Sequence, residues 1–69
     1  METKYIVSGM TCEHCVKHVT EEVQALEGVD GVSVQLEGGK MTVASKTLIP
    51  FDAIIEAVKE AGDYSVVEA

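Results

Sequence analysis

The chain has 69 residues, of which 46% are hydrophobic and 25% charged, and its formal net charge is −7. So short a chain can bury only one core, so we expect a single domain over residues 1–69. Twelve acidic side chains stand against five lysines and no arginine, which argues against binding to nucleic acid or to an anionic membrane surface. No apolar run approaches the roughly 20 residues that span a bilayer, so we expect no membrane insertion.

The first third of the chain predicts a strand followed by a helix. Residues 3–8 form a short β-prone run that ends at a Ser–Gly pair, as strands commonly do. Residues 13–27 carry apolar side chains at steps of three and four, which is the spacing of one helix face. Gly28 follows this series, where a glycine in the left-handed conformation often ends a helix.

The middle of the chain predicts a β-hairpin. Apolar and polar residues alternate over residues 31–37, the pattern of a half-buried strand. Gly38 and Gly39 predict a two-residue turn, and the alternation continues at Met41 and Val43 in a returning strand.

The last third predicts a second helix and a final strand. Pro50 lies near the expected start of the helix, Gly62 ends it, and residues 64–67 form a short apolar strand. The order β-α-β-β-α-β predicts an α+β fold of the ferredoxin-like type, a four-stranded antiparallel sheet with two helices on one face. The expected core stripe of the two helices is Val16, Val19, Val23, Ile54, Ile55 and Val58.

Cys12 and Cys15 are the only cysteines, and they lie where the first strand meets the first helix. A small secreted domain would carry more cysteines, and the N-terminus does not resemble a signal peptide, so we expect a reduced, cytoplasmic protein. Cys15 falls in the first helical turn, where unpaired N–H groups and the helix dipole lower the pKa of a thiol. The pair is therefore a candidate site for binding a metal ion.

Two thiolates suit Cu(I), because they are soft ligands and leave a net charge of −1 on the complex. Zn(II) usually takes four ligands, so His14, His18, Glu13 or Asp63 would have to complete its site. The two histidines lie one helical turn apart and need not converge on the sulfurs. The residue count favours Cu(I) and leaves Zn(II) open.

Residues 9–15, Gly-Met-Thr-Cys-Glu-His-Cys, resemble the GMxCxxC motif of heavy-metal-associated domains. Residues 29–34 and 54–62 are also similar to that family in order and spacing, so the likeness covers essentially the whole chain. Small bacterial copper chaperones are the most similar members. The resemblance implies that Cys12 and Cys15 bind Cu(I) and pass it, by thiolate ligand exchange, to the CxxC domain of a copper-transporting P-type ATPase. It implies a carrier and not an enzyme.

Two other functions fit the same residues. The chain could be a metal-binding domain from a larger P-type ATPase that handles copper, zinc or mercury. A thiol–disulfide oxidoreductase would also place a CxxC at a helix start. The chain is too short for a thioredoxin-like domain, and it has no tryptophan to support such an active site.

The residues around the cysteines carry further expectations. The family commonly has an aromatic residue or a lysine directly after the glycine that ends the second helix, whereas here Asp63 intervenes before Tyr64. Either Tyr64 packs against the metal loop, or Asp63 favours a more positive ion. We expect Met10 in the core and Thr11 as the cap of the first helix. His14 and His18 are expected to face solvent, with His14 reaching metal only in a copper-bridged homodimer.

Overall fold

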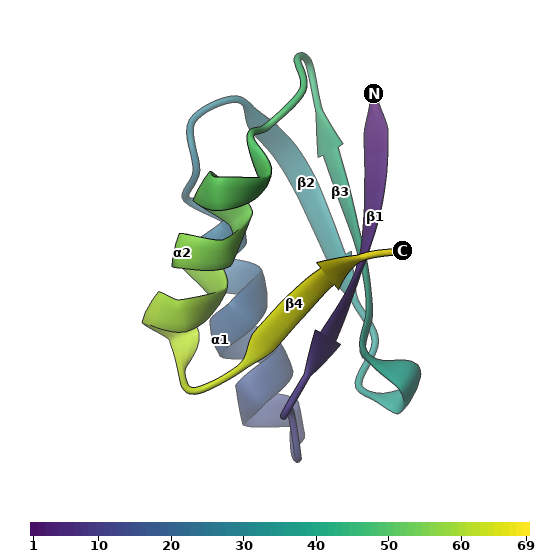
Figure 1. Cartoon of the computed structure of the whole chain (residues 1–69), viewed down its shortest axis with the longest axis vertical. Helices are drawn as coiled ribbons and strands as arrows, with labels where there is room; N and C mark the ends of the chain where they lie inside the picture. Colours follow the sequence, from purple (N-terminus) through teal and green to yellow (C-terminus); the bar gives the residue numbers. More distant parts are fainter.

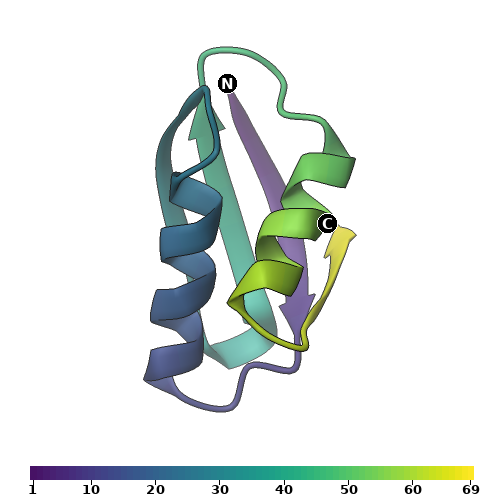
Figure 2. The same cartoon turned by 90° about the vertical axis from the view of Figure 1, so that its left-hand side faces the viewer.

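The computed structural model describes residues 1–69 and confirms the predicted order of elements. Four strands form one antiparallel sheet in the order β2-β3-β1-β4. Both helices pack on the same face of this sheet (Figure 1, Figure 2). The elements are β1 (Glu2–Ser8), α1 (Glu13–Gln24), β2 (Val29–Val34), the 3₁₀ turn η1 (Glu37–Gly39), β3 (Lys40–Ser45), α2 (Phe51–Ala61) and β4 (Ser65–Glu68).

The core lies between the sheet and the helices. Alternation along the strands sends one row of side chains toward the helices, and Tyr5 and its partner across the sheet, Met41, are both buried there. The ring of Tyr5 also stacks on Phe51 of α2, with centroids 5.8 Å apart. Of the predicted helical core, Val16 and Ile55 are only half-buried, because they lie at the edge of their apolar stripes. The buried members are Val19, Val23, Ile54 and Val58.

The first helix is shorter than predicted. It ends at Gln24 instead of residue 27, and the N–H of Leu26 donates to the carbonyl of Val23 in a tighter turn. Leu26 still packs against the core from this turn, which is why its spacing resembled a continuing helix. Gly28 has a φ of 91°, as expected of a left-handed glycine, and β2 begins directly after it.

The predicted two-residue hairpin turn is wrong. The connection is longer: Gln35 N–H donates to Lys40 O at 2.8 Å, and the chain between them forms η1. Gly39 has a φ of 66°, and a Cβ at this position would lie 2.0 Å from the carbonyl oxygen of Val7 in β1. Gly39 is thus a glycine because the backbones of η1 and β1 lie too close together for a side chain, and it is not part of a two-residue turn.

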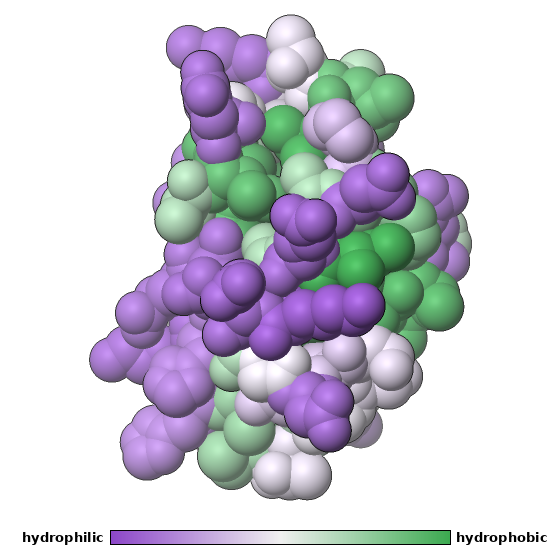
Figure 3. Space-filling model, turned by 60° about the vertical axis from the view of Figure 1, so that its left-hand side comes forward, coloured by the Kyte–Doolittle hydropathy of each residue, from purple (hydrophilic) through white to green (hydrophobic).

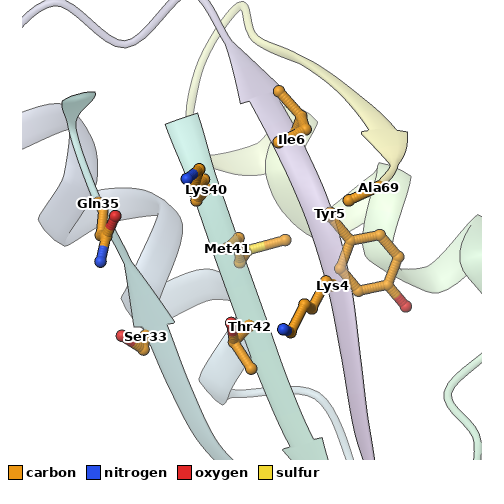
Figure 4. A pocket seen from close by; sticks show the side chains of 9 residues that line it. All are labelled: Lys4, Tyr5, Ile6, Ser33, Gln35, Lys40, Met41, Thr42 and Ala69. Atoms are coloured by element: carbon orange, nitrogen blue, oxygen red, sulfur yellow. The ribbon is translucent and has the colours of Figure 1, made fainter. Parts of the chain in front are cut away.

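The face of the sheet opposite the helices is uncovered and carries a shallow hollow (Figure 4). Lys4 of β1 and Lys40 of β3 line this hollow, together with polar side chains and no acidic one. Neither helix has the length and the apolar character that spanning a bilayer requires.

Candidate metal centre

The loop between β1 and α1 brings both cysteines to one end of the molecule (Figure 1). Cys12 is the residue that precedes α1, and its carbonyl accepts the N–H groups of Cys15 and Val16 at 3.1 and 3.3 Å. The prediction that Thr11 caps the helix is wrong, because no side chain makes a capping hydrogen bond. The Thr11 hydroxyl lies instead 3.9 Å from the Cys15 sulfur.

The two sulfurs lie side by side as free thiols. Cys12 Sγ and Cys15 Sγ are 3.5 Å apart, well beyond the length of about 2.05 Å of a disulfide bond. Cys12 is exposed and Cys15 half-buried. The pair can therefore face one ion while one side of that ion stays open to solvent.

The acidity of Cys15 is strongly changed by its surroundings. Its pKa is lowered from 9.0 to about 6, chiefly by a hydrogen bond with the Tyr64 hydroxyl and further by the Thr11 backbone and the Cys12 thiol. Burial opposes this shift only in part. The same hydrogen bond raises the pKa of Tyr64, because the phenol holds its proton more tightly beside a thiolate. Cys15 is thus mainly a thiolate at neutral pH.

Two glycines leave room for the Tyr64 ring beside the loop. A Cβ on Gly62 would lie 2.7 Å from Tyr64 Cε2, and a Cβ on Gly9 would lie 3.2 Å from Tyr64 Cδ1. Tyr64 N–H donates to Gly62 O at 2.9 Å, closing a three-residue turn centred on Asp63. This turn accommodates the extra residue, so that Tyr64 faces the cysteines while Asp63 is exposed. Of the two sequence-based alternatives, the structure shows the packing of Tyr64.

The sequence of residues 4–63 matches the family model of the heavy-metal-associated domain. This chain belongs to the heavy-metal-associated domain family. It is 45% identical over 64 residues to the copper chaperone CopZ of Bacillus subtilis, an alignment that covers 91% of this chain and 84% of that one.

Two solved structures share the fold of this heavy-metal-associated domain. A CopZ metallochaperone superposes with a TM-score of 0.86 at 28% identity, covering 97% of this chain and 100% of the other. The copper-binding domain of HMA7, a P-type ATPase, superposes with a TM-score of 0.87 at 26% identity, covering 99% and 92% of the two chains.

No His, Asp or Glu side chain of this heavy-metal-associated domain joins the two cysteines as a third possible ligand. No three or more His, Cys, Asp or Glu side chains gather closely enough to hold an ion. His14 and His18 are exposed, as predicted, and Met10 packs against the core, as predicted. The contacts of Gly9 and Gly62 with the Tyr64 ring were not predicted from the sequence. The signal for them was a glycine in each of the two loops beside the cysteines, one of them close to an aromatic residue.

Proposed function

We propose that this protein is a Cu(I) carrier of the cytoplasm, in which Cys12 and Cys15 hold one ion as cargo. The carrier passes the ion to the CxxC domain of a copper-transporting P-type ATPase and catalyses no reaction itself. The observation that carries the proposal is the pair of free thiols 3.5 Å apart, one exposed and one of lowered pKa. Free thiols at this separation fit a reducing compartment.

The donor set supports a soft monovalent ion. Thiolate is a preferred ligand of Cu(I), and two thiolates around it leave one negative charge. Zn(II) usually takes four protein ligands in a structural site, whereas no third His, Cys, Asp or Glu joins this pair. The two sulfurs lie 3.5 Å apart, close enough to bind one ion together. The exposure of Cys12 leaves room for an incoming ligand.

The exposure of the site supports release as well as capture. An incoming thiolate can bind the ion from the solvent side, giving a three-thiolate intermediate shared between two proteins. One outgoing thiolate then leaves, a second incoming thiolate replaces the other, and copper stays Cu(I) throughout. The same exposure allows a copper-bridged homodimer, in which the second pair of thiolates comes from another copy of the chain.

The relatives support copper as the cargo. One is named as a copper chaperone and a structural neighbour is a copper-binding domain of a P-type ATPase. A domain within such an ATPase would use the same two cysteines, so that alternative makes the same prediction for metal binding. A CxxC oxidoreductase makes a different one, since it must reduce disulfides in a substrate protein.

Competition with a Cu(I) chelator of known affinity tests the proposal. We expect one Cu(I) per chain in the wild type and none in the Cys12→Ser/Cys15→Ser variant, with Zn(II) bound more weakly in a parallel titration. His14→Ala is the matched control, because this exposed residue lies between the cysteines and should leave the affinity of the monomer unchanged. Tighter binding of Zn(II) than of Cu(I), or reductase activity comparable to that of a thioredoxin, would contradict the carrier function.

A further inference from the structure

We propose that His14 and His18 form a second metal site, separate from the cysteines, for a divalent first-row transition ion such as Ni(II) or Cu(II). The two side chains lie four residues apart on α1, and both are exposed. Neither takes part in the dithiol site described above. The inference goes beyond the copper-carrier function and does not depend on it.

Helix geometry places the two side chains on one face of α1, within reach of a common ion. Residues four apart on a helix have Cβ atoms about 5–6 Å apart on the same face. The same spacing supplies the two zinc-binding histidines of HExxH helices, so it suits chelation of one ion. Both residues lie within the regular span of α1, one in its first turn and the other in its second.

The chemistry of this pair differs from that of the thiols. Imidazole nitrogen binds divalent Zn, Cu and Ni, whereas thiolate selects soft ions such as Cu(I). No third His, Cys, Asp or Glu is close enough to complete a cluster, so water would fill the remaining coordination positions. A thiolate site for soft ions and an imidazole site for divalent ions would thus lie side by side at the start of α1.

The surrounding charge favours a divalent cation. Glu21 and Glu22 of α1 and Glu60 of α2 line the same surface hollow as His18. Hydrophilic side chains cover much of this helical side of the molecule (Figure 3). Nearby negative charge raises the local concentration of cations without itself coordinating them.

Titration with Ni(II) alone tests the site in the Cys12→Ser/Cys15→Ser background, which removes the thiolates. We expect one Ni(II) per chain by calorimetry, with paramagnetic broadening of the His14 and His18 ring signals in NMR spectra. His14→Ala and His18→Ala should each weaken binding by about tenfold or more, because the second imidazole acts at high effective concentration. Cu(II) should bind more tightly than Ni(II).

A relocated histidine is the matched control. The His18→Ala/Gln24→His change keeps two histidines on α1 but places them about 15 Å apart along the helix axis, too far to share an ion. We expect this variant to bind Ni(II) as weakly as His18→Ala does. Retention of tight binding in either variant would overturn the chelate site, as would broadening at one histidine alone.

Discussion

At the scale of single residues, the two cysteines differ in their surroundings. Cys12 is exposed, whereas Cys15 is half-buried and accepts a hydrogen bond from the Tyr64 hydroxyl. Its surroundings therefore lower the pKa of Cys15 well below the ordinary value of a thiol. Its charge depends on an aromatic residue from the loop that follows α2, so the two loops act together on one sulfur.

Removing the Tyr64 hydroxyl should raise the pKa of Cys15. Tyr64→Phe keeps the ring between Gly9 and Gly62 but removes the largest of the interactions that lower this pKa to about 6. We expect the pKa to rise toward its ordinary value of 9.0. The rate of Cys15 alkylation against pH, followed residue by residue with mass spectrometry, measures the shift. His14→Ala should leave the profile unchanged, and an unshifted profile in Tyr64→Phe would contradict this role of Tyr64.

The same interaction makes stability depend on pH. Because the pKa of Cys15 is lower in the folded chain than in the unfolded one, ionisation of this thiol stabilises the fold. The stabilisation is fully present above the unfolded pKa and is lost as the pH falls from 9.0 through about 6. Urea unfolding should therefore show a difference between wild type and Tyr64→Phe that is present at high pH and vanishes at pH values below the folded pKa.

At the scale of elements, the connection from β2 to β3 depends on Gly39. Its φ of 66° disfavours a side chain, and a Cβ would lie 2.0 Å from the backbone of β1. We expect Gly39→Ala to lower the free energy of unfolding by about 3 kcal/mol, since left-handed strain and overpacking add. Urea denaturation measures this loss.

Two other glycines, Gly38 in η1 and Gly31 in β2, separate the contributions of strain and contact. Gly38 also has a positive φ, of 77°, but a Cβ there would meet only the Lys40 side chain at 3.9 Å. Gly38→Ala should therefore cost about 1 kcal/mol, the conformational part alone. Gly31→Ala meets nothing within 4 Å and should leave stability unchanged or slightly raised. If Gly38→Ala and Gly39→Ala lowered the free energy of unfolding equally, the close contact of Gly39 with β1 would make no contribution to stability.

The helices and strands could be predicted because each depends on the spacing of apolar residues within its own short segment of the chain. Strand alternation and helix spacing gave the order of elements and the ferredoxin-like fold, which the structure confirms. Their ends could not be predicted where tertiary contacts decide them. Leu26 has the spacing of a helical core residue, but it contacts the core from the turn that follows α1. Gly39 follows Gly38 as in a two-residue hairpin turn, but its backbone packs closely against β1.

The candidate site could be predicted only in part. The CxxC spacing and the position of Cys15 in the first turn of α1 follow from the sequence. The turn at Asp63 does not, because the hydrogen bond from Tyr64 to Gly62 depends on where the ring can fit. The Thr11 cap was wrong because helix propensities do not tell which of two adjacent residues begins the helix.

At the scale of the whole molecule, charge is unevenly distributed. Glu22, Glu56 and Glu60 outnumber Lys59 in the hollows along the two helices, whereas Lys4 and Lys40 line the uncovered face of the sheet with no acidic side chain. With a net charge of −7, the molecule should approach a basic partner with its helical side first. Cys15 lies on one of these two helices, in the first turn of α1.

Copper transfer to a basic CxxC acceptor should therefore slow as salt is added. We expect the second-order rate to fall by about tenfold between low and high ionic strength, because salt screens the charges that steer association. Stopped-flow measurement of transfer gives the rate. Glu60→Gln should slow the encounter more than Glu2→Gln, which removes the same charge from β1. A rate independent of salt, or an equal effect of both variants, would contradict steering through the helical side.

The Tyr64 ring beside the thiols has an optical consequence. The chain contains no tryptophan and only two tyrosines, so its tyrosine emission comes from Tyr5 and Tyr64 alone. Tyr5 is 2% exposed and its ring stacks on Phe51 in the core. Tyr64 instead interacts through its hydroxyl with Cys15, which raises the pKa of the phenol. The protein thus carries a built-in fluorophore whose signal follows the state of the sulfurs without any added dye.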